Sequence, residues 1–80
     1  MRLVNKPINV ELEGAGRYRP HTLHTHLGTL HVRSRLDFWV VQTKWWRGEI
    51  RRVYLLLDTS EGIVEVYTDG ERWWLWRIED

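Results

Sequence analysis

Three histidines are close enough in the sequence to form a metal site. His24 and His26 alternate along one predicted strand, and His31 follows on the next one. If Leu27-Gly28 forms a two-residue turn, His24 lies opposite His31 and all three side chains share one face. Three imidazoles placed in this way can hold zinc with an open fourth position, where a bound water could be activated for hydrolysis. The alternative is a solvated polar face, because no metal-binding motif accompanies these histidines.

Basic and aromatic side chains are interleaved between Lys44 and Arg52, where the sequence reads Lys-Trp-Trp-Arg-Gly-Glu-Ile-Arg-Arg. Single-stranded nucleic acid is bound by this mixture, since cations contact phosphates and aromatic faces stack on bases. The alternative is that Trp45 or Trp46 anchors the core, because neighbouring residues of a strand face opposite ways. The nucleic-acid hypothesis assigns the surface to Lys44, Trp45, Trp46, Arg47, Arg51, Arg52, Arg33 and Arg35.

Other catalytic machinery is scarce in this chain. Ser34 and Ser60 are the only serines, and neither lies in the sharp strand-to-helix turn of a serine nucleophile. The glycines of segment 14–16 lack the Lys-Ser or Lys-Thr pair of a phosphate-binding loop. The absence of cysteine excludes disulfides, zinc fingers, iron–sulfur clusters and thiol nucleophiles. We therefore expect a binding module rather than an enzyme, with no cofactor other than the zinc considered above.

Length and composition indicate one folded domain that spans residues 1–80. Hydrophobic residues make up 42% of the 80 positions and charged residues 29%, which is typical of a globular domain. Segment 1–7 has no apolar core of a signal peptide, and no uncharged stretch approaches a membrane span, so we expect a cytoplasmic protein that does not contact membranes. The chain has one methionine and no cysteine, and such a low content of thermolabile residues is typical of thermophilic proteins.

The near-neutral charge of the chain hides a strong asymmetry. Residues 1–52 carry ten basic and four acidic side chains, a balance of +6, whereas residues 53–80 carry two basic and seven acidic ones, a balance of −5. The basic part could meet an anionic partner. Equally, the two parts could attract each other within the fold.

Alternating polar and apolar residues predict six short strands. Segment 36–46 does not alternate regularly, because the apolar run Phe-Trp-Val-Val is followed by Gln-Thr-Lys. We expect a short helix or an irregular segment there. Six short antiparallel strands with tight turns favour an all-β fold, either a small barrel or a strongly bent sheet. The strands are predicted at residues 7–13, 21–26, 29–35, 49–57, 63–68 and 71–78.

The Asp69-Gly70 pair predicts a hairpin with a two-residue turn. Such a turn pairs Val66 with Trp73 and places both on one face of the sheet. Pairing Leu57 with Ile63 across the preceding loop extends that face onto the strand before it. We expect this face to form the core, with the side chains of Tyr54, Leu56, Val64, Val66, Trp73 and Leu75.

The opposite face of the same strands is also apolar, so it needs a cover. The N-terminal strands could supply the cover, or a second copy of the chain could. In the second case the protein is a protein–protein or self-association module that forms a homodimer. The face it would use contains Val53, Leu55, Trp74 and Trp76.

Several short motifs between residues 17 and 80 keep a characteristic order. They are Arg19-Pro20, Gly28, Val32, Trp39, Trp45-Trp46-Arg47, Tyr54 and the C-terminal pattern Trp-x-Leu-x-Arg-Ile-x-Asp. In this order the chain resembles a family of small bacterial domains of unknown function. Members of that family stand alone or are appended to larger proteins, including relatives of the ImuB-type Y-family polymerase-like mutagenesis proteins. The chain departs from the family at His24, His26 and His31, where many relatives carry aromatic residues.

The resemblance implies no catalytic residue, because the family has no established activity. It implies a DNA-repair setting for some members. A nucleic acid or a DNA-repair protein is therefore the partner that the resemblance favours.

Overall fold

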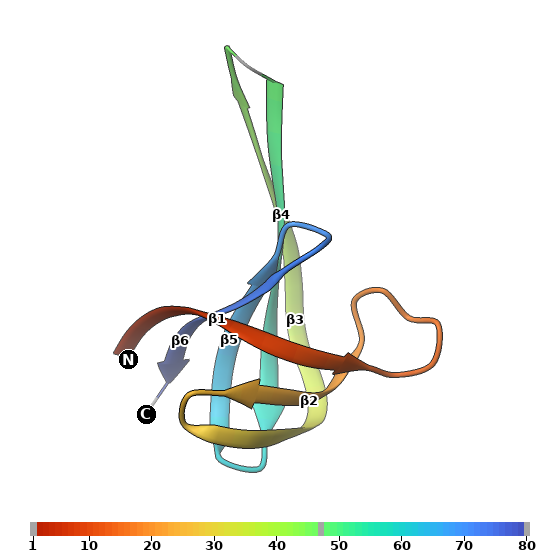
Figure 1. The fold of residues 1–80 in the computed structure, drawn as a ribbon, viewed down its shortest axis with the longest axis vertical. Helices are drawn as coiled ribbons and strands as arrows, with labels where there is room; N and C mark the ends of the chain where they lie inside the picture. The colour runs from red at the N-terminus through yellow and green to blue at the C-terminus, as the bar shows by residue number, and fades with distance from the viewer. Residues whose placement is uncertain (1, 47, 80) are drawn as a thin grey trace.

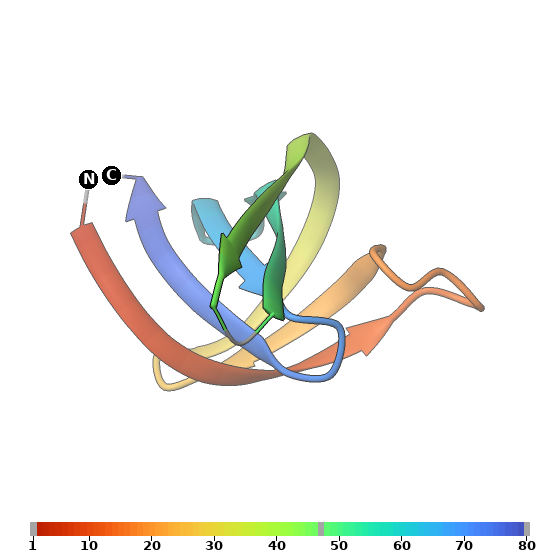
Figure 2. The ribbon, with the colours of Figure 1, turned by 90° about the horizontal axis from the view of Figure 1, so that it is seen from above.

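Six antiparallel strands form one closed barrel, in which each strand pairs with the next and the last pairs with the first (Figures 1 and 2). The computed structural model describes residues 2–46 and 48–79, and all of their side chains except that of position 45. The all-β antiparallel barrel predicted from the sequence is confirmed. In the described part of the chain, no helix is long and apolar enough to cross a membrane. The strands are β1 (Arg2–Leu12), β2 (Pro20–Thr25), β3 (Gly28–Trp45), β4 (Gly48–Thr59), β5 (Gly62–Thr68) and β6 (Trp73–Glu79).

Alternate side chains of every strand point into the barrel and form its core. Most are leucine, isoleucine or valine, whose branched side chains pack well on a pleated surface. Trp73 is partly buried and packs against this cluster. The buried cluster consists of Ile8, Leu23, Leu30, Val53, Leu55, Leu57, Val64, Val66, Leu75 and Ile78.

Segment 36–46 does not form a helix, because β3 is a strand of 18 residues that continues to Trp45. The pairing of β3 with β4 shifts register between Val32 and Ser34, and again between Arg35 and Asp37. Each such bulge adds a residue to one strand and changes which side chains face inward. Both bulges lie before residue 38, and from Asp37 to Trp45 the strand pairs regularly with β4.

The β4–β5 hairpin has a shorter loop than the sequence analysis predicted. Thr59 pairs with Gly62, so the loop has only two residues, and Leu57 faces Val64 instead of Ile63. Thr59 stabilises this turn, because its Oγ1 donates to the Gly62 carbonyl at 2.6 Å and accepts from the Glu61 N–H at 3.2 Å. Gly62 has a φ of 116°, which a residue with a Cβ rarely adopts.

This one-residue difference in register reverses the faces of β4. Val53 and Leu55, predicted to lie on an exposed association face, are 3% and 0% exposed and belong to the core. Tyr54 and Leu56, predicted to be core residues, lie on the outer face and are only half-buried. The predictions for these four residues are wrong for this single reason.

The β5–β6 hairpin has a longer turn than predicted, because Thr68 pairs with Trp73. The Asp69 carboxylate accepts the N–H groups of Glu71 and Arg72, both at 2.9 Å, and these bonds hold the pKa of Asp69 below its ordinary value. The register differs from the predicted one by two residues, and a shift of two preserves the faces. The prediction that Val64, Val66 and Leu75 lie in the core is therefore confirmed.

Candidate functional site

A two-stranded arm rises from the barrel and is the most prominent feature of its surface (Figure 1). β4 pairs with β5 only as far as Val53, whereas its pairing with β3 continues from Val41↔Arg52 to Trp45↔Gly48. Residues 41–52, here called the arm, therefore have a strand neighbour on one side only. The arm accounts for the elongated shape of the molecule, which measures 40 × 31 × 21 Å.

The two faces of the arm carry different cations. Arg51 pairs with Gln42, and Lys44 pairs with Glu49, so both cations lie on the face that continues the inner face of the barrel. Arg52 pairs with Val41 on the opposite face. All five of the described polar residues in these pairs are exposed: Gln42, Lys44, Glu49, Arg51 and Arg52.

The tip of the arm presents a tryptophan to solvent. Trp46 is 81% exposed, the highest value among the exposed large apolar side chains. Arg47 and the side chain of Trp45, which were also predicted to bind nucleic acid, lie outside the part that the structure describes. The described members of the predicted set that come together on the arm are Lys44, Trp46, Arg51 and Arg52.

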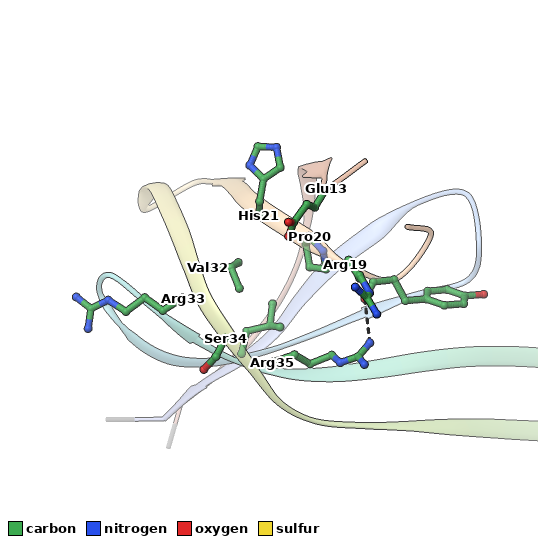
Figure 3. A pocket seen from close by; sticks show the side chains of 10 residues that line it. Glu13, Arg19, Pro20, His21, Val32, Arg33, Ser34 and Arg35 are labelled. Carbon is green, nitrogen blue, oxygen red and sulfur yellow. Dashed lines mark hydrogen bonds between the residues drawn. The ribbon is translucent and has the colours of Figure 1, made fainter. Parts of the chain in front are cut away.

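Arg33 and Arg35 lie lower on β3 and do not belong to the arm. They line a hollow of about 290 Å³ between β3 and the loop that connects β1 to β2 (Figure 3). Arg35 donates to the Tyr18 carbonyl at 3.3 Å and lies 4.8 Å from the ring centroid of Phe38. Arg33 points away from Arg35 and Arg19 (Figure 3). The structure therefore separates these two arginines from the other predicted binding residues.

A row of aromatic rings crosses the outer face at the foot of the arm. Trp39 stacks on Tyr54 with centroids 5.8 Å apart and planes 2° apart. Tyr54 in turn contacts Tyr67 at 5.2 Å, and Tyr67 stacks on Trp74 at 5.0 Å. These residues are directly paired across β3, β4, β5 and β6. Trp39 and Tyr54 therefore cover part of each other's ring faces, as do Tyr67 and Trp74.

Tyr67 links the arm to this row. The guanidinium of Arg52 lies 5.1 Å from the centroid of the Tyr67 ring, and the Tyr67 hydroxyl donates to Asn5 Oδ1 at 3.0 Å. Burial raises the pKa of Tyr67 above its ordinary value, and the nearby Arg52 charge only partly opposes this effect. Tyr67 therefore remains protonated at neutral pH and holds Arg52 against the outer face.

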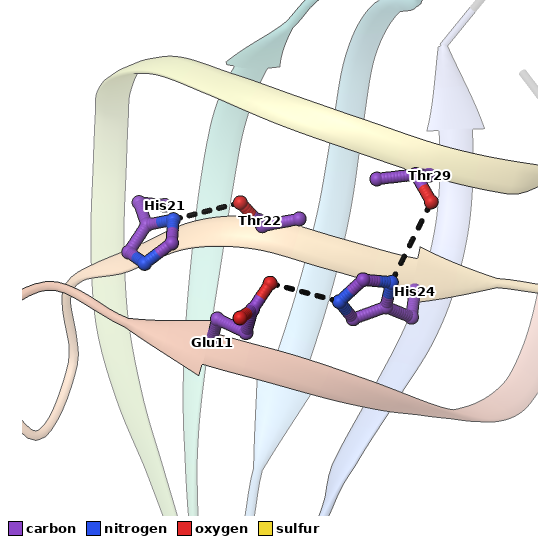
Figure 4. A network of polar contacts seen from close by, with 5 residues as sticks. All are labelled: Glu11, His21, Thr22, His24 and Thr29. Carbon is purple, nitrogen blue, oxygen red and sulfur yellow. Dashed lines mark hydrogen bonds and ion pairs between the residues drawn. The ribbon is translucent and has the colours of Figure 1, made fainter.

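The histidines do not form the predicted metal site. The β2–β3 turn contains His26, and the register pairs His24 with Thr29 and His31 with Thr22. The predicted pairing of His24 with His31 is therefore wrong. His24 instead contacts Glu11 Oε2 at 2.9 Å and Thr29 Oγ1 at 3.5 Å (Figure 4). Within residues 2–46 and 48–79, no three His, Asp or Glu side chains form a group that could hold a metal ion.

The aromatic row was missed in the sequence analysis because two registers were mispredicted, that of β4–β5 by one residue and that of β5–β6 by two. The signal was present in Thr59-Ser60-Glu61-Gly62, where a glycine follows two turn residues. Thr25-His26-Leu27-Gly28 has the same form, and in both turns the threonine Oγ1 donates to the glycine carbonyl. Reading Thr59–Gly62 as a two-residue turn pairs Tyr54 with Tyr67, whereas the contact of Tyr67 with Trp74 depends on the longer β5–β6 turn.

Comparisons with protein-family models, with curated proteins and with solved structures find no match to this chain.

Proposed function

We propose that the protein is a non-catalytic module that binds single-stranded nucleic acid through the arm. The observation that carries this proposal is the charge and position of residues 41–52. They contain four basic side chains (Lys44, Arg47, Arg51 and Arg52) and one acidic side chain (Glu49), a balance of +3 on a ribbon that stands clear of the barrel. Phosphates are attracted to such a ribbon because its described cations, Lys44, Arg51 and Arg52, are exposed to solvent.

The arrangement of the arm supports a flexible strand as its ligand. Lys44 and Arg51 lie on one face and Arg52 on the other, so a backbone that crosses the arm meets cations on both sides. Trp46 at the tip presents a large ring on which a base can stack, an interaction that tolerates any sequence.

The resemblance to small domains near ImuB-type proteins is consistent with this proposal. It favours a role beside a DNA-repair protein in the cytoplasm, where the arm would contact the nucleic acid and the barrel would serve as its support.

The first test of the proposal is a tryptophan-fluorescence titration with a single-stranded oligonucleotide. Neutralising four phosphates predicts a slope of log affinity against log salt of about −2.8, since each contact contributes about −0.7 on a single strand. Affinity should then fall about 50-fold between about 50 mM and about 200 mM salt. An affinity that does not change with salt would contradict phosphate contacts.

Charge variants locate the binding surface. The double variant Arg51→Gln/Arg52→Gln should reduce the salt slope to about −1.4, because two of four contacts are removed. The matched control is Arg2→Gln/Arg17→Gln, which removes the same charge from exposed positions outside the arm. Equal losses in the two double variants would show that general charge, and not the arm, attracts the oligonucleotide.

A further inference from the structure

The outer face of the arm contains a hollow of about 190 Å³, here called the arm hollow. Its lining side chains come from neighbouring positions of β3 and β4 and share one face of the sheet. Four of them are exposed and Tyr54 is half-buried, so the arm hollow is open to solvent. A cavity of about 150 Å³ with apolar walls can hold a benzene ring, and the arm hollow therefore has room for one planar ring system. The lining residues are Val41, Thr43, Ile50, Arg52 and Tyr54.

The lining of the arm hollow suits an aromatic ring that is joined to an anion. Val41 and Ile50 supply apolar walls, and Tyr54 supplies an aromatic ring. Arg52 is the only charged residue among the five, and its planar guanidinium matches the geometry of a phosphate. A planar base and a phosphate, linked through a sugar, make up a nucleotide.

The cation of the arm hollow is held in position by the barrel. The guanidinium of Arg52 lies 5.1 Å from the centroid of the Tyr67 ring. This ring is fixed in turn, because Tyr67 is buried and its hydroxyl donates to Asn5 Oδ1 at 3.0 Å. A side chain that is already held loses less conformational freedom when a ligand binds. Arg52 is therefore prepared to contact an anion beside the arm hollow.

The opposite face of the arm is less suited to a nucleotide. There Gln42 Nε2 donates to Glu49 Oε2 at 2.6 Å, across the two strands. Glu49 is the only acidic residue of segment 41–52, and its carboxylate repels a phosphate. The described residues that line the arm hollow include no acidic one. The two faces therefore differ, and the outer face accommodates a base and a phosphate together.

We propose that the arm hollow holds one unpaired nucleobase of the bound strand, while Arg52 contacts the phosphate next to that base. This inference rests on the proposed function of the arm and adds the place where a base is held. A single strand offers such a base directly, whereas a duplex must first break a base pair and unstack the base. The arm hollow therefore selects single-stranded over double-stranded nucleic acid.

Fluorescence anisotropy with two end-labelled single-stranded oligonucleotides of equal length tests the inference, one with its bases and one with abasic sites throughout. Both carry the same phosphates, so the ratio of their dissociation constants measures the contribution of the bases. Contact of one base with an aromatic side chain strengthens binding about fivefold or more. The unaltered protein should prefer the oligonucleotide with bases, and Tyr54→Leu should lower this preference about fivefold. The matched control Tyr18→Leu removes the same ring from a half-buried position outside the arm and should keep the preference.

The results that would overturn the inference are distinct from failure of the proposed function. Equal binding of the two oligonucleotides would leave the phosphate contacts of the arm in place and exclude a base site. A preference that persists in Tyr54→Leu would assign the base to another ring, such as Trp46, and equal losses in both tyrosine variants would show a general effect. If neither oligonucleotide binds, the proposed function fails and the inference fails with it.

Near-UV circular dichroism checks that both tyrosine variants are folded. If Tyr54→Leu does not fold, Ile50→Ala takes its place, because Ile50 is 38% exposed and lies outside the buried core cluster. Ile50→Ala removes an apolar wall of the arm hollow and should lower the preference for bases about threefold. An unchanged preference in this variant would also overturn the inference.

Discussion

Among single residues, Glu65 occupies the most demanding position. Its side chain is 2% exposed although it lies on the outer face of β5, and its Oε1 accepts a hydrogen bond from Arg77 Nη2 at 2.9 Å. A buried carboxylate is stable only when a charge or hydrogen-bond donor compensates for the lost hydration. The stability of the barrel therefore depends more on Arg77 than it would on an ordinary surface arginine.

Arg77→Leu should lower the free energy of unfolding by about 2–4 kcal/mol, because it leaves the Glu65 carboxylate buried beside an apolar group. The value lies below that of a fully buried pair because the Arg77 side chain is 29% exposed. Urea denaturation followed by circular dichroism measures the loss. The double variant Glu65→Leu/Arg77→Leu should recover most of it, and a double variant as unstable as the single one would show that packing, not charge, is responsible.

At the level of secondary-structure elements, the sequence pattern identified the strands but not their register. Val64, Val66 and Leu75 were placed correctly because alternation within one strand is a local property. The faces of β4 could not be derived in the same way, since they depend on whether Leu57 meets Ile63 or Val64 across a short turn. A difference of one residue there reversed the assignments of Val53 and Leu55.

The arm was only partly predictable for a related reason. Its basic and aromatic composition was evident, and Lys44, Trp46, Arg51 and Arg52 do come together on it. The position of the arm outside the barrel was not evident, because an apolar run such as residues 38–41 ordinarily indicates a buried strand. The position of the arm depends on the length of β5, which pairs with β4 and ends at Thr68, opposite Val53.

Shortening the arm should leave the barrel folded. Val41 and Arg52 are already paired, so an Asn-Gly turn can join them in place of residues 42–51 without a change of register. The removed segment contributes nothing to the buried core cluster, and we expect the free energy of unfolding to change by no more than about 1 kcal/mol. Thermal unfolding of both proteins checks this expectation. A large loss of stability would mean that the arm is an integral part of the barrel.

At the level of the whole molecule, the charge asymmetry is also an asymmetry in space. The acidic residues 53–80 form the end of β4, β5 and β6, whereas the basic residues of the arm extend away from these strands (Figure 1). Because of this separation, the acidic side chains of residues 53–80 neutralise the basic side chains of the arm only to a limited extent. The exposed cations of the arm, Lys44, Arg51 and Arg52, are the ones that the proposed nucleic-acid contact uses.

The most direct test of the arm's function compares the unaltered protein with the shortened-arm variant in one oligonucleotide titration at about 50 mM salt, where phosphate contacts are strong. The unaltered protein should bind the single-stranded oligonucleotide with quenching of tryptophan fluorescence. The folded variant, which lacks Lys44, Trp46, Arg47 and Arg51, should bind at least about tenfold more weakly, since three of four phosphate contacts and the stacking ring are absent. Equal binding by the two proteins, or no binding by the folded unaltered protein, would contradict the proposal that the arm binds nucleic acid.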